Sequence, residues 1–219
     1  MPVNGAELDD NLRLRIAGMA VVPVLELGLD WYDRWQTLIL YEGPFVAEHS
    51  WEDEFGIVHA ETSERSGEAC ERGPVVLSLE DVRHSGQGDG YNVVIHELAH
   101  TLDMRDASAN GAPPLHAGMD PAAWQRDFAA AWNDLARRAD NDEPLPVDEY
   151  ALEDPAEFFA VLSETFFEQP EPLHAAWPAV YRHLAAFYRQ EPLTSENGTY
   201  LRITPQPAVE TGLDEAFPE

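Results

Sequence analysis

Two histidines and a glutamate lie within five residues in the stretch NVVIHELAHTLDM, residues 92–104. In a helix of 3.6 residues per turn, His96 and His100 share one face and can bind a single ion. Glu97 lies about 100° away around the helix, beside the open position of that ion. This is the HExxH arrangement of zinc hydrolases, in which the glutamate takes a proton from metal-bound water. The stretch therefore predicts a catalytic zinc site.

The context of the motif supports this interpretation over chance. HExxH is short enough to arise in unrelated helices. Here, however, the remaining positions of VVIHELAHTL are apolar, which predicts a buried helix. Polar and charged groups are costly to bury unless something pairs with them, so a bound metal ion accounts for the three side chains better than coincidence does.

The zinc site needs a third protein ligand, and one candidate lies close by. Asp106 stands where metzincin-type sites, HExxHxxGxxH, place their last ligand. Those sites need a glycine to turn the chain back to the metal, and Asp103 occupies that position here. Met119 is a poor candidate for the methionine turn of such sites. Asp106 is therefore the weaker alternative.

Two further candidates lie on a later acidic helix, DPAEFFAVLSETFFE. Glu157 and Glu164 are seven residues apart and share a face of that helix. Glu157 also fits a capping box, with Asp154 as the cap and the glutamate at the third helical position. Glu164 could equally be a surface acid, so the pattern alone leaves both glutamates open as the third ligand.

The elements around these residues predict an α+β fold, a small mixed sheet packed on the HExxH helix with further helices after it. A single catalytic domain is expected over residues 1–192, followed by an acidic, proline-containing tail at 193–219 that we expect to be loosely ordered. The expected helices are residues 7–20, a helix after Asp120 that begins with Pro121, a helix after Asp154 that begins with Pro155, and residues 173–189. The expected strands are residues 21–25, 37–41, 55–60 and 73–79.

Composition excludes several classes of function. The 219 residues carry a net charge of −28, and all 13 basic residues are arginine. Such a field repels phosphate backbones and anionic lipid surfaces, so neither nucleic acid nor a membrane is an expected partner. The apolar stretch 16–29 contains Pro23 and Glu26 and follows acidic residues, unlike a signal peptide. With Cys70 as the one cysteine, no intrachain disulfide can form, which fits a cytoplasmic protein.

Four stretches of the chain carry a resemblance to a known family. They are PVLELGLDWYDRWQTLILYEGPFV, GPVVLSLEDV, NVVIHELAHTLDMRDASANGAP and YALEDPAEFFAVLSETFFEQP. The chain resembles the Mlc titration factor A family of bacterial zinc metallopeptidases from about residue 13 to 192. The segment before Leu12 is much shorter than the N-terminal region expected of that family.

The resemblance implies a zincin-like fold in which His96, His100 and Glu157 bind Zn²⁺ and Glu97 is the catalytic base. It also suggests Tyr150 as an active-site residue, and a phenol there could donate a hydrogen bond to the oxyanion of a tetrahedral intermediate. The implied activity is that of an aminopeptidase on short peptides. The family further implies binding to a sugar-responsive transcriptional repressor, so the alternative is a regulatory protein that sequesters this repressor.

Three supporting roles follow from the residues. Asp103 could accept a proton from a ligand imidazole and fix its tautomer, or it could cap the helix end or pair with Arg105. Glu164 could do the same orienting work. The strand at Val75–Leu79 is expected at the edge of the sheet, where an extended peptide could add to it as a further strand.

Overall fold

The chain forms a mixed α/β structure in its described part. The computed structural model describes residue 2 and residues 7–33, 35, 37–52, 58–69 and 73–193. These residues contain a three-stranded sheet, a separate two-stranded hairpin and seven α-helices. Of the expected tail at 193–219, all but Leu193 lies outside this part of the chain.

The larger sheet is mixed, with the strand order β1-β5-β4. β1 (Leu38–Tyr41) runs parallel to β5 (Val75–Ser78), and β4 (Gly67–Ala69) runs antiparallel to β5. The expected strands at 37–41 and 73–79 are therefore confirmed. The expectation that the second of these lies at the edge is wrong, because β4 covers it. β4 has only three residues and no hydrophobic alternation, so sequence periodicity could not reveal it.

The hairpin precedes β4 along the chain. β2 (Phe45–Glu52) pairs antiparallel with β3 (Val58–Arg65), with Phe45 opposite Arg65. The strand expected at 55–60 agrees with β3 only from Val58 onward, and residues 53–57 lie outside the described part. The end of β3 leads through Ser66 directly into β4. The chain therefore passes from the hairpin into the edge strand of the larger sheet.

The N-terminal segment is helical where a strand was expected. Asp9 caps α1 (Asp10–Val21), because its Oδ1 accepts a hydrogen bond from Leu12 N at 2.7 Å. The chain then continues into the 3₁₀ helices η1 (Val22–Val24) and η2 (Leu29–Tyr32), so the strand expected at 21–25 is wrong. Pro23 explains the difference, because proline lacks the N–H that a strand needs and fits the first turn of a helix.

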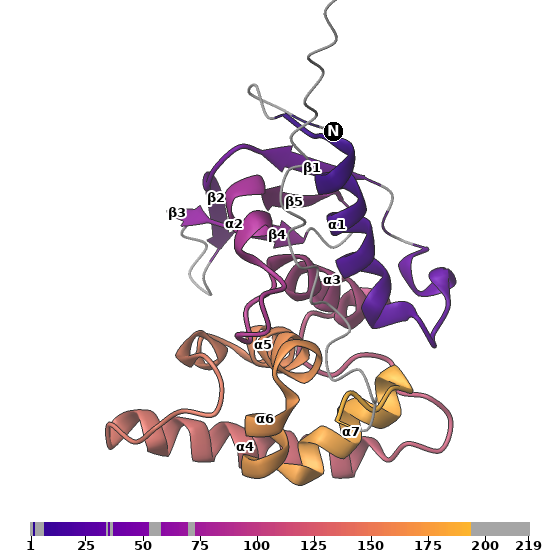
Figure 1. The fold of residues 1–219 in the computed structure, drawn as a ribbon. Coiled ribbons are helices and arrows are strands. Elements are labelled where there is room, and N and C mark those ends of the chain that lie inside the picture. Colours follow the sequence, from indigo (N-terminus) through magenta and orange to yellow (C-terminus); the bar gives the residue numbers. More distant parts are fainter. Residues whose placement is uncertain are drawn as a thin grey trace, which may run out of the picture.

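The HExxH helix is the centre of the fold. α2 (Leu79–His84) leads through a glycine loop to α3 (Val93–Asp103), which is followed by the short helix η3 (Met104–Asp106). Asn92 caps α3 by accepting a hydrogen bond from Ile95 N at 3.1 Å. Figure 1 shows α3 between the sheet and α5, and it contacts β4, β5, α1 and α5. Eight of its eleven residues are buried, which explains its apolar sequence.

The helices after α3 begin with proline in every case: α4 (Pro121–Asp140), α5 (Pro155–Glu168), α6 (Pro170–Ala176) and α7 (Pro178–Tyr188). The short helix η4 (Glu149–Leu152) precedes α5. The single helix expected at 173–189 is two helices, because Pro178 starts a new one after Trp177. Within the described chain, no helix combines the length and apolarity needed to cross a membrane.

Candidate metal centre

Three side chains from two helices meet at the exposed face of α3. The Nε2 atoms of His96 and His100 lie 3.2 Å apart. Oε2 of Glu157, in the first turn of α5, lies 2.9 Å from Nε2 of His96 and 3.4 Å from Nε2 of His100. In the part of the chain that the structure describes, these three residues form the group able to hold a metal ion, with ligand atoms within 4.8 Å of one another. Two imidazoles and a carboxylate are donors typical of zinc.

The start of α5 explains why Glu157 reaches the histidines. Asp154 caps this helix, because its Oδ1 accepts hydrogen bonds from Ala156 N at 2.7 Å and Glu157 N at 3.0 Å. In a capping box the glutamate would return to the backbone of Asp154. Here its carboxylate instead approaches both imidazoles. The capping interpretation is therefore correct for Asp154 and wrong for the side chain of Glu157.

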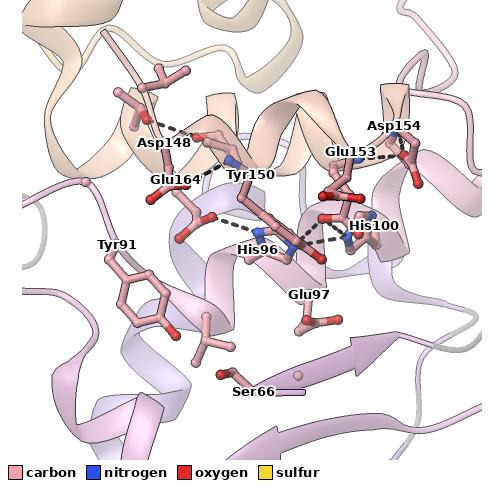
Figure 2. A pocket seen from close by; sticks show the side chains of 18 of the residues that line it. Ser66, Tyr91, His96, Glu97, His100, Asp148, Tyr150, Glu153, Asp154 and Glu164 are labelled. Atoms are coloured by element: carbon pink, nitrogen blue, oxygen red, sulfur yellow. Dashed lines mark hydrogen bonds and ion pairs between the residues drawn. The ribbon is translucent and has the colours of Figure 1, made fainter. Parts of the chain in front are cut away.

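Glu164, two turns further along α5, holds the other ring nitrogen of His96. Its Oε1 lies 2.7 Å from Nδ1 of His96, and its Oε2 accepts a hydrogen bond from Asn92 N at 2.6 Å. A carboxylate at Nδ1 keeps that nitrogen protonated and leaves the Nε2 lone pair for an ion. The spacing of Glu157 and Glu164 therefore places one carboxylate at each ring nitrogen of His96. Figure 2 shows the contact of Glu164 with His96.

The carboxylates of this cluster favour a positively charged group between them. Burial by itself would lower the pKa of His96, but the carboxylates of Glu164 and Glu157 raise it well above its usual value. Burial would raise the pKa of Glu157, but hydrogen bonds from His100 and His96 hold it well below its usual range. A divalent cation can balance the negative charge of these carboxylates.

Glu97 lies on the sheet side of the histidines and is 5% exposed. Its Oε2 has no hydrogen-bond partner among the described residues, and burial raises its pKa against the lowering effect of His96 and His100. Figure 2 shows Glu97 between the histidines and β4. A Cβ atom at Gly67 would lie 2.6 Å from both Cγ and Cδ of Glu97, so a larger residue here would have to displace the side chain of Glu97 or the strand.

Tyr150 lies across the site from β4. It belongs to η4, its side chain is half-exposed, and its ring centroid is 6.1 Å from that of His96. Asp148 caps η4 by accepting a hydrogen bond from Tyr150 N at 2.8 Å. The structure therefore brings Tyr150 to the site, in front of the histidines in Figure 2.

The two aspartates after the motif do other work. Asp103 is fully buried, and its Oδ2 accepts hydrogen bonds from Asn110 N at 2.9 Å and Gly111 N at 2.7 Å. A Cβ atom at Gly111 would lie 2.8 Å from the carbonyl carbon of Pro155, so this loop packs against the first turn of α5. Asp103 thus links the end of α3 to the helix that carries Glu157.

Neither aspartate takes the role considered first for it. Arg105 pairs with Asp33 at 2.7 Å rather than with Asp103. Asp106 is exposed on η3 and is not part of the described group that can hold an ion. Glu164, rather than Asp103, is the residue whose carboxylate contacts a ligand imidazole.

A cleft of about 940 Å³ opens over these residues. β4 forms one wall with Ser66, Gly67 and Ala69, and the segment from Leu145 to Asp154 forms another. Ser66 and Tyr91 lie on the side away from Tyr150 in Figure 2. The close approach of Gly67 to Glu97 was missed by sequence reasoning, because nothing near residue 67 resembles a motif.

The chain is similar to a described family and to named proteins over most of its length. The sequence profile of the family described as "Glucose-regulated metallo-peptidase M90" matches residues 1–189. A "Mlc titration factor A" from Serratia proteamaculans (strain 568) is 44% identical over 196 residues, which cover 88% of this chain and 74% of the relative. Proteins of the same name from Yersinia enterocolitica (serotype O:8 / biotype 1B) and Yersinia pestis (strain Pestoides F) are 42% identical over 88% of this chain, covering 73% and 72% of those relatives.

Proposed function

This chain belongs to the glucose-regulated metallo-peptidase M90 family, and from that membership and the geometry of the site we propose that it is a zinc-dependent peptidase. The observation that carries the proposal is the convergence of His96, His100 and Glu157 within 4.8 Å, beside a buried glutamate. A purely structural metal site has no use for an unpaired acid such as Glu97 next to its open side.

The donor set fits a zinc ion in several respects. Both histidines present Nε2, Glu164 fixes the orientation of one ring, and the carboxylate of Glu157 completes three protein ligands. Three protein ligands would leave a bound zinc ion open to water. Zinc held there would lower the pKa of that water to about 7 and polarise a carbonyl oxygen.

The residues around that position take complementary roles. Glu97 accepts a proton as the nucleophile forms and delivers it to the leaving amine, and burial raises its pKa above that of a free glutamate. Tyr150 donates a hydrogen bond to the developing oxyanion from the opposite wall. Burial of Glu97 against Gly67 keeps its carboxylate in one place.

We place the substrate peptide along β4 rather than along β5. Ser66 O accepts a hydrogen bond from Ser78 N at 2.8 Å, so the backbone of Ser66 faces β5. Because residues in an antiparallel pair alternate in direction, the N–H and C=O groups of Gly67 face the open edge. An extended peptide can add there as a strand, with its scissile bond over Glu97 and the histidines. The implied activity is that of an aminopeptidase on short peptides.

Metal analysis with peptide hydrolysis tests the proposal. Glu97→Ala should retain zinc and lose hydrolysis by a factor of about 10² to 10⁴, because it removes the proton-transferring group. Glu157→Ala should bind zinc more weakly. Full activity of Glu97→Ala would refute the mechanism. Tight zinc binding in Glu157→Ala that is lost in Asp106→Ala would favour the metzincin-like alternative.

A regulatory role is the second candidate, and the name of the relatives favours it. A "Mlc titration factor A" is named for titrating Mlc, and this chain is 44% identical to one such protein. We propose that this chain binds a transcriptional repressor related to Mlc in the cytoplasm. Repressor binding by Glu97→Ala, measured by co-elution from a sizing column, separates the two roles. Unaltered binding by an inactive variant shows that sequestration does not need hydrolysis.

A further inference from the structure

The cleft over the metal centre is walled by carboxylates. None of its described lining residues is an arginine or lysine. Besides the glutamates that contact or adjoin the histidines, four exposed acids line it: Asp89, Asp148, Glu153 and Asp154. A cleft lined by one sign of charge focuses the field and concentrates ligands of opposite charge. The cleft therefore favours substrates that bring a cationic group to it.

Three of these four acids already accept hydrogen bonds from backbone N–H groups. Asp89 accepts a hydrogen bond from Tyr91 N at 3.2 Å, Asp148 caps η4, and Asp154 caps α5. The carboxylate of Glu153 has no hydrogen bond or ion pair with any described residue, although it is exposed and borders the cleft. It is thus the acid with both oxygens available to a ligand.

The local helix aims Glu153 to the same side as Tyr150. Glu153 N donates a hydrogen bond to Tyr150 O at 3.1 Å, which closes the turn of η4. In a 3₁₀ helix of three residues per turn, side chains at i and i+3 lie on one face, about 6 Å apart along the axis. Both residues line the cleft, and Figure 2 shows both on the wall opposite Ser66.

We propose that Glu153 binds the free α-ammonium group of the substrate, and so restricts the site to peptides with an unblocked N-terminus. This inference rests on the proposed peptidase function. In a peptide the α-nitrogen is about 2.5 Å from the carbonyl carbon of its own residue, as bond lengths and angles dictate. If Tyr150 holds the oxyanion of that carbonyl group, the ammonium group lies close to Tyr150 on the same wall of the cleft. Glu153 lines that wall too.

The chemistry of this contact discriminates between substrates. An ammonium group and a carboxylate form short, charge-assisted hydrogen bonds, which are roughly twice as strong as neutral ones. An acetylated terminus has a neutral amide N–H in its place and gains no such bond. Losing a hydrogen bond to a charged group costs about tenfold to a hundredfold in affinity.

Glu153→Gln tests the proposal because it removes the charge and keeps the shape. The substrates are an alanyl tetrapeptide with a free N-terminus and its N-acetylated twin, with zinc content measured for each protein. We expect kcat/KM for the free peptide to fall about tenfold to a hundredfold, mainly through KM, and that for the acetylated twin to stay unchanged. Equal losses on both peptides overturn the assignment.

Controls separate this proposal from the peptidase function itself. Glu149→Gln changes an acid of the same 3₁₀ helix that does not line the cleft, and it should leave both rates unchanged. An acetylated peptide with an internal lysine tests the other source of ammonium. If Glu153→Gln lowers the rate only for that peptide, Glu153 binds a cationic side chain of the substrate. That result overturns recognition of the N-terminus.

The outcome remains decisive if the wild type cleaves neither peptide, which would end the peptidase proposal. Alanine hydroxamate and N-acetylalanine hydroxamate bind metal sites and differ in the free amine, and calorimetry measures their affinities for the zinc-loaded protein. A preference for the free amine that disappears in Glu153→Gln supports the ammonium site on its own. Equal affinities in the wild type overturn it.

Discussion

Replacing Gly67 by alanine should disable Glu97 without disturbing the proposed metal ligands His96, His100 and Glu157. The added Cβ would lie 2.6 Å from Cγ and Cδ of Glu97, where ordinary contacts are 3.4–4 Å. The glutamate side chain or the strand must therefore move by about 1 Å. A misplacement of this size in a reacting group can cost about 100-fold in rate. That loss corresponds to about 2.7 kcal/mol of transition-state stabilisation.

Steady-state hydrolysis of a peptide substrate measures this effect, together with the zinc content and thermal midpoint of the purified variant. We expect kcat to fall about 100-fold while zinc stays bound, because the three atoms nearest to the added Cβ all belong to Glu97. The φ angle of Gly67 is not in the left-handed region, so alanine brings no backbone strain. The defect should therefore arise from the contact with Glu97.

Gly18→Ala is the matched control. A Cβ atom at this position of α1 would have nothing within 4 Å, and alanine favours a helix over glycine by about 1 kcal/mol. This variant should be slightly more stable and fully active. Wild-type kcat in Gly67→Ala, with zinc bound, would refute the inference that β4 fixes the position of the catalytic glutamate.

Two further predictions concern the supports of the site. Glu164→Gln should weaken zinc binding about 10- to 100-fold in competition with a chromophoric chelator, since His96 loses the carboxylate at Nδ1. Glu168→Gln is its control, because Glu168 bonds Asn92 and Gly88 instead, and equal affinities of the two variants would contradict the role of Glu164. Burial raises the pKa of Asp103 from 3.8 to about 6. Between pH 3.8 and 6 the folded protein therefore holds a proton that the unfolded chain has released. The free energy of unfolding consequently falls as the pH rises through this range. Relative to the wild type, the free energy of unfolding of metal-free Asp103→Asn in urea should therefore gain roughly 2 kcal/mol between pH 4.5 and 7.5, and parallel pH curves would refute this.

The sequence predicted the local features of the site well. HExxH spacing placed both histidines on one face of a helix, and Asp-Pro pairs marked the starts of two later helices, because these signals act within one or two turns. The seven-residue spacing of Glu157 and Glu164 identified both acids that reach His96. Spacing could not say which contacts which nitrogen, since that depends on how α5 lies against α3.

The two wrong strand predictions have different causes. Val21–Leu25 has the β-branched residues of a strand but continues a helix, because Pro23 fits the first turn of a helix and not a strand. The strand expected at the edge lies at the centre of the sheet, because β4 pairs with it from elsewhere in the chain. β-propensity describes a fit to neighbours that the sequence does not name.

By itself, the sequence determined which side chains of α3 can share one ion, because His96 and His100 are one helical turn apart and their geometry follows from the helix alone. Only the tertiary structure decided the rest of the site. Asp103 and Gly111 place the first turn of α5 against α3, which brings Glu157 to the histidines. β4 passes over Glu97 because Gly67 has no side chain. These are close contacts between segments far apart in the chain, and packing fixes them, not local preference.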